Sequence, residues 1–186
     1  MLFIGLIKQK VLNLPIILEI MENLRITDLT KPHNRKEIEK KISELKKTKK
    51  VVATSGYFDP LHFGHVELLT LSKKLGDYLI AIINNDSQTM QKKGYVFMQA
   101  EEKAKIISEL SAVDEVFISL DKDQTQCKTL ELLKPHIFTK GGDRYIYEIP
   151  ETPICKEHGI EIIDGVGAKV QSSSSLVEKA NAMKEK

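Results

Sequence analysis

The chain has 186 residues, of which 41% are hydrophobic and 29% are charged. This length is enough to bury one sizeable core but less than two ordinary domains need. The formal net charge of +2 comes from 28 basic and 26 acidic side chains, which excludes the strongly basic balance typical of nucleic-acid-binding proteins, so we expect no nucleic-acid partner. Cys127 and Cys155 share no metal-ligand spacing, which favours reduced thiols in a cytoplasmic protein.

Residues 1–20 are apolar but are interrupted by Lys8, Lys10 and Pro15. A membrane-spanning helix needs about 20 predominantly apolar residues, and a signal peptide has a different pattern. We therefore expect no membrane segment. Met21 opens a stretch of ordinary soluble composition, which leaves open whether translation begins there and whether residues 1–20 belong to the fold.

The first periodic segment covers residues 33–47, where Ile38, Ile42 and Leu45 recur at helical spacing among charged residues. This pattern predicts an amphipathic helix. The lysine-rich run at residues 46–50 is typical of a solvated connection rather than of a phosphate-binding or RNA-binding segment. We divide the chain into a leader over residues 1–20, an N-terminal amphipathic helix and basic linker over residues 21–49, and a main domain over residues 50–186.

From residue 51 onward, short apolar runs alternate with amphipathic segments. Strands and helices in alternation imply parallel pairing with right-handed crossovers. Continuous apolar runs such as residues 78–83 are expected where helices cover both faces of a sheet. The pattern predicts an α/β fold, a doubly wound (Rossmann-like) parallel five-stranded sheet with helices on both faces. The predicted strands cover residues 51–55, 78–84, 115–120, 136–139 and 160–164, and the helices cover residues 64–75, 100–110, 125–133, 150–158 and the segment from 173.

The loop over residues 56–65 leads from the first of these strands directly into a helix. Ligands of doubly wound sheets bind outside the carboxyl ends of the strands, and a helix start offers unpaired N–H groups to a phosphate. His62 and His65 are three positions apart, so their imidazoles lie on one face of the first turn, about 5 to 6 Å apart at Cβ. Such donors stabilise the charge that builds on a phosphoryl group in transfer.

A lone histidine is more often a core or capping residue, but this pair, in a glycine-containing turn after an apolar strand, favours phosphoryl or nucleotidyl transfer. Zinc binding is a third interpretation. No cysteine or carboxylate lies at a complementary spacing from His62 and His65, so we expect no metal ligand among these side chains.

Residues 51–77, which contain His-x-Gly-His at residues 62–65, resemble the opening of the cytidylyltransferase-like nucleotidylyltransferases. Pantetheine-phosphate and nicotinamide-mononucleotide adenylyltransferases and some aminoacyl-tRNA synthetases carry the same motif. The Lys-Lys-Leu-Gly-Asp segment at residues 73–77 narrows the resemblance to glycerol-3-phosphate cytidylyltransferases and heptose-1-phosphate adenylyltransferases. The resemblance covers about residues 50 to 180 and identifies residues 50–186 as the nucleotidylyltransferase domain.

Three later segments agree with this resemblance. Lys92 and Lys93 are similar to lysines of a family loop that folds over phosphates. Residues 140–143 are similar to a Lys-Gly-Gly-Asp segment of heptose-phosphate adenylyltransferases, and residues 171–175 are similar to the family's Ser-Thr-Thr segment. The alternatives are solvated lysines, a strand-ending turn and a helix N-cap. The Arg-Pro pair that often follows the family's loop lysine is missing from residues 94–98, which leaves acceptor recognition open.

The resemblance implies an enzyme that transfers a nucleoside monophosphate from ATP or CTP to a small phosphorylated acceptor and releases pyrophosphate. The acceptor is a sugar, polyol or amino-alcohol phosphate, and Mg²⁺ accompanies the nucleoside triphosphate. We also expect a homodimer. A cofactor-biosynthetic adenylyltransferase of the NAD, FAD or CoA type and a non-catalytic nucleotide-binding domain are the alternatives. The implied site residues are His62, His65, Lys92 and Lys93 in catalysis, Gly56, Tyr57, Phe58, Gly64, Lys140, Gly142, Asp143, Ser172, Ser173 and Ser174 on the nucleotide, and Asp59 and Asp86 on the acceptor.

Overall fold

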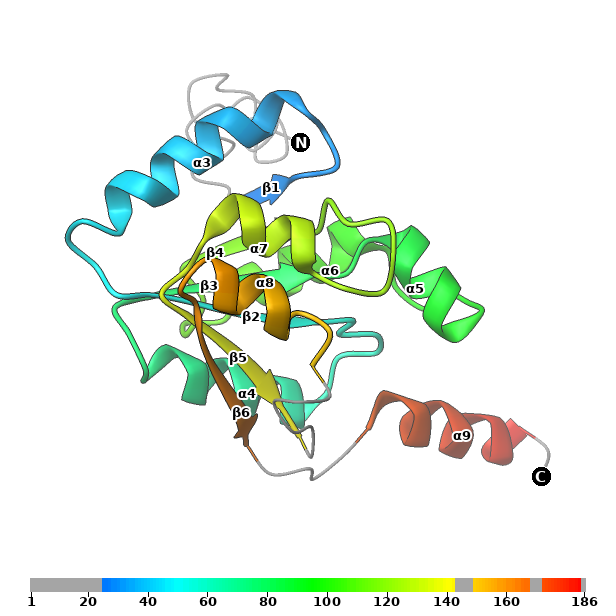
Figure 1. Ribbon diagram of the computed structural model, residues 1–186. Helices are drawn as coiled ribbons and strands as arrows, with labels where there is room; N and C mark the ends of the chain where they lie inside the picture. The colour runs from blue at the N-terminus through cyan, green and yellow to red at the C-terminus, as the bar shows by residue number, and fades with distance from the viewer. Residues whose placement is uncertain (1–24, 143–148, 168–171, 185–186) are drawn as a thin grey trace, which may run out of the picture.

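The computed structural model describes residues 25–142, 149–167 and 172–184, which form a parallel six-stranded sheet between two layers of helices (Figure 1). The leader expected over residues 1–20 lies outside the described residues. Within the described part of the chain, no helix is both long and apolar enough to cross a membrane. The elements are β1 (Ile26–Asp28), α3 (His33–Leu45), β2 (Val51–Gly56), α4 (Phe63–Lys73), β3 (Tyr78–Ile83), α5 (Asp86–Lys93), α6 (Ala100–Ser108), β4 (Glu115–Ile118), α7 (Cys127–Leu133), β5 (Ile137–Gly141), α8 (Thr152–Glu157), β6 (Glu161–Val166) and α9 (Ser173–Lys184).

The strands are ordered β1-β4-β3-β2-β5-β6, and all neighbouring pairs are parallel. From β2 the chain proceeds outward through β3 to β4, and it then crosses back to place β5 and β6 on the other side of β2. The direction of winding therefore reverses between β2 and β5. In doubly wound sheets this reversal leaves a crevice at the carboxyl ends of the strands, where ligands bind.

Alternate residues of each strand enter two separate apolar layers. In β3, Ile80 and Ile82 belong to the layer that also contains side chains of α3, α7 and α8. Leu79, Ala81 and Ile83 belong to the layer shared with α4 and α6. Figure 1 shows α3, α7 and α8 on one side of the sheet and α4 on the other. Burial on both faces explains why β3 is a continuous apolar run, and it confirms the predicted doubly wound α/β architecture.

The predicted number of five strands was wrong, because β1 adds a sixth. This strand pairs in parallel with β4, with Ile26 opposite Val116 and Asp28 opposite Ile118. Leu29, which follows directly, is fully buried. Three residues at a sheet edge, two of them polar, are too few to show an apolar run or an alternation. The segment before residue 50 therefore supplies a strand as well as the expected helix.

The segment after β3 was predicted as a lysine-bearing loop, and this prediction was also wrong because residues 86–93 form helix α5. Asn85 caps the helix by accepting from the backbone N–H of Gln88 at 2.9 Å, and the Gln88 side chain accepts from the N–H of Asn85 at 3.1 Å. Gly94 ends it in the left-handed conformation at φ 77°. The helix is mostly polar, so it lacks the apolar periodicity that reveals a longer helix, and only its end signals mark it.

Gly76 packs the turn between α4 and β3 against the start of β2. The carbonyl oxygen of Lys50 accepts from the N–H of Asp77 at 2.9 Å, and the Asp77 carboxylate accepts from the N–H of Lys50 at 2.8 Å. A Cβ atom on Gly76 would lie 2.5 Å from the Lys50 oxygen and 2.7 Å from a methyl group of Val52. The first of these contacts is with backbone, which has little room to move.

We expect Gly76→Ala to lower the free energy of unfolding by about 1 to 3 kcal/mol, the usual cost of forcing a group into a packed site. Urea unfolding monitored by circular dichroism measures this loss. Lys74→Ala, at an exposed position two residues earlier, is the control and should change stability little. Equal stability of Gly76→Ala and the unmodified protein would contradict the packing described for this turn.

Candidate active site

A cleft of about 370 Å³ opens at the carboxyl ends of β2 and β5, where the winding of the sheet reverses. It is lined by parts of the turn over residues 56–65, which includes the histidine pair, and by Lys93 of α5, the end of β5 and the serine cluster at residues 172–174. These segments lie far apart in the sequence, and the parallel sheet brings them together. The predicted residues that line the cleft are Gly56, Tyr57, Phe58, His62, Gly64, His65, Lys93, Lys140, Gly142, Ser172, Ser173 and Ser174.

The turn after β2 folds back beneath the histidines. Phe58 has a positive φ of 50° and a fully buried ring, which meets the His65 ring edge-on with the centroids 5.0 Å apart. A Cβ atom on Gly56 would lie 3.0 Å from Cζ of Phe58. Such a contact is tighter than an ordinary van der Waals contact, so a side chain at residue 56 would press on the ring that packs against His65.

His62 and His65 form a stacked pair at the start of α4. His62 is the N-cap of the helix, and the two rings lie 3.7 Å apart at their centroids with an interplanar angle of 18°. The backbone N–H of His62 donates to Nδ1 of His65 at 3.3 Å. Because Nδ1 of His65 accepts, the neutral ring carries its proton on Nε2, where it is a donor. The predicted proximity of the two imidazoles is confirmed.

Burial keeps this pair neutral. Desolvation, together with the nearby charges of His62 and Lys93, lowers the pKa of His65 from 6.5 to about 3. Desolvation and the charge of Lys93 also lower the pKa of His62. Neutral imidazoles at physiological pH act as hydrogen-bond donors, and a ring with so low a pKa is a poor carrier for a proton. Such donors can stabilise negative charge without taking up a proton.

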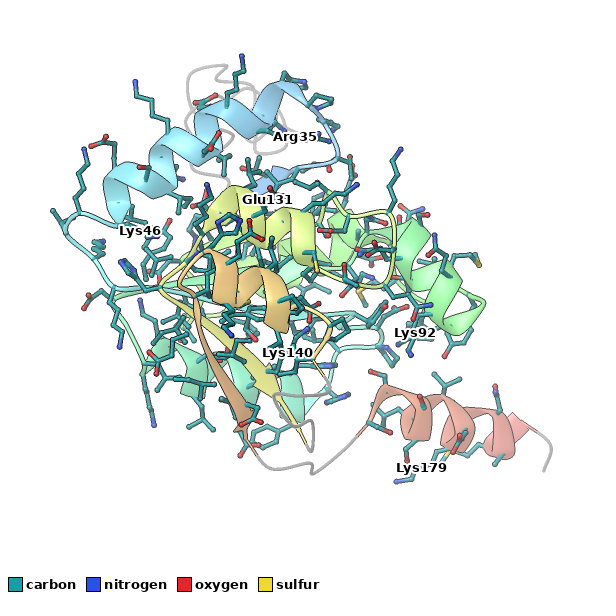
Figure 2. All side chains as sticks on the ribbon, viewed as in Figure 1. Arg35, Lys46, Lys92, Glu131, Lys140 and Lys179 are labelled. Carbon is teal, nitrogen blue, oxygen red and sulfur yellow. The ribbon has the colours of Figure 1, made fainter. Side chains whose placement is uncertain are left out.

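Lys93 is the cation that reaches the histidines from α5. Its ammonium group donates to the carbonyl oxygen of Asp59 and lies 5.9 Å from the centroid of the Tyr57 ring. Desolvation lowers the pKa of Lys93. Lys92 is exposed and does not line the cleft, and Figure 2 shows it near the end of α5. Of the two predicted lysines, the structure brings only Lys93 to the site.

Asp59 and Asp86 lie behind the cleft rather than in it. The Asp59 side chain is fully buried, and its carboxylate accepts from the N–H groups of Phe97 at 3.0 Å and Met98 at 2.8 Å. The Asp86 carboxylate accepts from the N–H of Ala100 at 2.8 Å. Both carboxylates therefore hold the connection between α5 and α6, which begins directly after Lys93. Their predicted contact with the acceptor is untested and stays a prediction.

The serine cluster starts α9 beside the turn that carries the histidines. Ser173 donates through Oγ to the carbonyl oxygen of Pro60 at 3.0 Å. Oγ of Ser172 accepts from the N–H of Ser175 at 3.2 Å, as an N-cap does. The cluster thus both caps a helix and lines the cleft, two roles that one helix start can combine. Asp143 lies outside the described residues.

Several residues that line the cleft were not predicted. Ser55, Asn84 and Gly141 lie at or next to the carboxyl ends of β2, β3 and β5, so this position was a usable signal. Gln124, Gln126 and Glu151 belong to no motif and come from the connections that lead into α7 and α8. The described residues include no group of three or more His, Cys, Asp or Glu side chains placed to hold a metal ion. The unpredicted lining residues are Ser55, Leu68, Asn84, Gln124, Gln126, Gly141, Pro150, Glu151 and Val166.

Residues 53–181 match the family model described as cytidylyltransferase-like. The chain belongs to the cytidylyltransferase-like family. This membership confirms the resemblance stated for the His-x-Gly-His segment. The chain is 36% identical to the bifunctional protein HldE of a Nitratiruptor species over 136 residues, which are 72% of this chain and 28% of that protein. It is 34% identical to HldE of Hahella chejuensis, over 70% of this chain and 27% of that protein. It therefore spans less than a third of the length of these relatives.

Solved structures show the same architecture. The lipopolysaccharide core biosynthesis protein of Thermoplasma volcanium is 29% identical and superposes with a TM-score of 0.54, over 64% of this chain and 98% of that one. Pantoate-beta-alanine ligase from Francisella tularensis superposes with a TM-score of 0.56 over 87% of this chain and 78% of that one. Its identity of 18% makes it a likeness of fold alone.

We expect His65 to keep a single neutral form, with its proton on Nε2, from pH 8 down to about pH 5, because its pKa lies near 3. Two-dimensional ¹H–¹⁵N spectra of the imidazole groups distinguish the two nitrogens at each pH. His33, which is exposed, is an internal reference in the same spectra. A His65 ring that takes up a proton near pH 6.5 would contradict the described environment.

The same shift makes stability depend on pH. The folded-state pKa of His65 lies below the ordinary value of 6.5, so protons bind preferentially to the unfolded chain between these two values. The contribution of neutral His65 to the free energy of unfolding is complete above about pH 6.5 and is lost as the pH falls towards 3. Between pH 7 and pH 4, we expect His65→Gln to lose less stability than the unmodified protein in urea unfolding.

Proposed function

We propose that this chain is a nucleotidylyltransferase, which transfers a nucleoside monophosphate from ATP or CTP to a small phosphorylated acceptor and releases pyrophosphate. The observation that carries the proposal is the stacked His62 and His65 pair at the start of α4, in a cleft at the switch point of a cytidylyltransferase-like fold. Neutral imidazole donors, helix N–H groups and the ammonium group of Lys93 provide what a phosphoryl group in transfer requires.

The reaction needs no covalent intermediate. A phosphate oxygen of the acceptor attacks the α-phosphorus, a new P–O bond forms, and the bond to the bridging oxygen of the β-phosphate breaks as pyrophosphate leaves. His62 and His65 donate hydrogen bonds to the phosphate oxygens as charge builds on them, and Lys93 adds a positive charge beside them. Positioning and electrostatic stabilisation supply the acceleration.

The cleft divides between its two substrates along the sheet. Gly142 and residues 172–174 belong to the segments after β5 and β6, and we assign the nucleotide to this side. Contact of Asp59 and Asp86 with the acceptor stays a prediction, and both carboxylates also hold the connection after α5, which begins next to Lys93. The resemblance to heptose-1-phosphate adenylyltransferases and the relative described as a lipopolysaccharide core biosynthesis protein both support a sugar phosphate as acceptor. The homodimer stays a prediction.

The proposal is tested by a screen for pyrophosphate release, in which ATP and CTP are each combined with heptose, hexose, glycerol and amino-alcohol phosphates. Mononucleotide and pantetheine phosphate acceptors belong in the same screen, because their turnover would indicate cofactor biosynthesis instead. Pyrophosphate release that requires one nucleotide and one sugar phosphate supports the proposal. Tight nucleotide binding without release from any acceptor would indicate a non-catalytic domain.

Turnover should require a divalent cation, with Mg²⁺ sufficient. Mg²⁺ enters bound to the triphosphate and neutralises part of its negative charge. This negative charge is larger than the positive charge that Lys93 and the neutral histidines provide. Since no cluster of metal ligands lies among the described residues, we expect no binding of Mg²⁺ to the protein without nucleotide. Titration calorimetry tests this binding, and full turnover in excess chelator would contradict the requirement.

Replacing His62 or His65 by Ala should lower kcat about 10²- to 10³-fold, the usual loss for one preorganised donor. KM for the triphosphate should change less, because an interaction made mainly in the transition state contributes little to ground-state binding. Steady-state kinetics measure both parameters. Loss of one cap contact at the start of α4 costs about 1 kcal/mol, which corresponds to a fall of only a few degrees in melting temperature.

His65→Asn is the informative companion variant because it retains a neutral donor of shorter reach. Partial activity of this variant indicates hydrogen bonding as the role of His65. A purely structural pair predicts the opposite pattern, with stability lost and turnover per folded molecule preserved. Near-normal kcat in folded His62→Ala and His65→Ala proteins would remove the main support for the proposed function.

A further inference from the structure

Lys103 is a buried lysine whose ammonium group has no hydrogen-bond partner within the described part of the chain. It lies on α6, and its exposed fraction is 0%. Its helical neighbours Ala100, Ala104 and Ile107 belong to the apolar layer that α6 shares with α4. A lysine is rarely buried among apolar side chains, because its charge loses contact with water and needs opposite charges to compensate it. Lys103 therefore requires negative charge nearby.

The carboxylates of Asp59 and Asp86 supply this negative charge. Desolvation lowers the pKa of Lys103, and the charges of Asp59 and Asp86 act in the opposite direction. Since Nζ of Lys103 makes no hydrogen bond to either carboxylate, the attraction acts through charge alone. Lys93 is also close enough for its charge to act on Lys103. Lys93, Lys103, Asp59 and Asp86, which we call the charge cluster, thus combine two ammonium groups with two carboxylates.

Lys93 is the member of the charge cluster that lines the cleft. Its ammonium group donates to the backbone carbonyl oxygen of Asp59. The two carboxylate oxygens of Asp59 instead accept from backbone N–H groups of the connection between α5 and α6. Among the ion pairs of the described residues, none joins Lys93 to this carboxylate, although the charge of Asp59 acts on Lys93. Lys93 therefore lies beside a buried negative charge without forming an ion pair with it.

We propose that Lys103 is a positioning residue, which keeps the ammonium group of Lys93 at the cleft by offsetting the charge of Asp59. Lys103 attracts the same carboxylate as Lys93, and the two ammonium groups repel each other. Without Lys103, the buried carboxylate would lack one of its compensating charges. Coulomb attraction in a site that excludes water would then draw Lys93 into an ion pair with Asp59 and away from the phosphates of a ligand.

A purely structural role is the competing explanation. In that case Lys103 only balances the charge of two buried carboxylates, and its loss lowers stability without moving Lys93. The two explanations differ in their consequence for Lys93, so the experiment observes this side chain directly. The experiment needs no turnover, whereas any effect of Lys103 on kcat rests on the proposed function.

The first measurement is the rate at which the Lys93 amine reacts with acetic anhydride at mildly alkaline pH, read by peptide mass spectrometry on the full chain. An amine reacts in its uncharged form, and an ion pair favours the charged form. We expect Lys93 to react about tenfold more slowly in Lys103→Met, which removes the charge and retains an unbranched side chain. Lys92, an exposed neighbour on α5, should react at the same rate in both proteins. Lys105→Met, at an exposed position of α6, is the matched control.

The second measurement separates an ammonium group that has moved from one that has only become easier to protonate. Inorganic tripolyphosphate is titrated into each protein by calorimetry. A Lys93 side chain that moves into an ion pair contributes less to binding, so we expect Kd to rise about five- to tenfold in Lys103→Met. In the Lys93→Ala background, Lys103→Met should raise Kd by less than about twofold, because the contact is already lost. Lys103→Arg retains the charge and should restore both the labelling rate and Kd.

Asp59→Asn identifies the route of the effect. With the charge of Asp59 removed, Lys103→Met should no longer slow the reaction of Lys93, because the charge that draws its ammonium group is absent. This double variant also loses one charge of each sign, which avoids the destabilisation that an unbalanced buried charge causes. Lys103→Gln, which is neutral and polar, replaces Lys103→Met if the latter does not fold.

Circular dichroism establishes that each variant is folded. Unchanged labelling of Lys93 in folded Lys103→Met would indicate a structural role and overturn the inference. Slower labelling with unchanged binding of tripolyphosphate would indicate a change of charge without movement and overturn it too, as would a slowing that persists beside Asp59→Asn. Should the unmodified protein bind no tripolyphosphate, the proposed function fails, and the labelling of Lys93 in the variants with and without Asp59→Asn decides the inference alone.

Discussion

The cleft depends on the parallel pairing of β2 with β3 on one side and with β5 on the other. Because β3 and β5 continue the chain in opposite directions across the sheet, the segments that follow β2 and β5 diverge and leave a crevice at the carboxyl ends of the strands. Helix α4 then covers one face of the sheet, and α7 and α8 cover the other. One cleft thus receives side chains from both helical layers, and its two walls differ in chemistry.

The wall on the α4 side presents two neutral imidazoles and the ammonium group of Lys93 to the cleft. The histidines are fixed by stacking, by a backbone hydrogen bond and by the Phe58 ring beneath them. Burial beside Lys93 keeps both rings neutral, because a second and third positive charge in so small a space would be costly. These donors are oriented before any ligand binds, as the proposed stabilisation of a transition state requires.

Several polar groups around the cleft are buried without hydrogen-bond partners in the described part of the chain, which is expected to cost stability. Among the described residues, Nδ1 of His62, both side-chain polar atoms of Gln126 and Nζ of Lys103 are buried without hydrogen-bond partners. Lys103 is fully buried, and its pKa is lowered by desolvation and raised towards its usual value by the charges of Asp59 and Asp86. Such groups are expected where selection for binding opposes selection for stability. Two of them lie in the cleft, and Lys103 lies behind the connection that positions Lys93.

The spacing of apolar residues predicted the helices and strands that have a strong apolar pattern, and it missed those that do not. The strands β2 to β6 and the helices α4, α6, α7, α8 and α9 could be predicted, because most of these strands are buried on both faces and form continuous apolar runs. The edge strand β1 has only three residues, and α5 is a polar helix marked only by the caps at Asn85 and Gly94. Neither carries enough apolar residues to reveal a period.

The sequence by itself determined the chemistry of the α4 wall, because His62 and His65 are neighbours on a single helical turn and need no distant contact to meet. The resemblance of the chain to the cytidylyltransferase-like family also rests on that short segment. Only the tertiary structure decided the protonation state of His65, since burial and the approach of Lys93 lower its pKa. It also brought together Gln126, Lys140 and Glu151, which share no local spacing in the sequence and are linked by a hydrogen bond and an ion pair at one wall of the cleft.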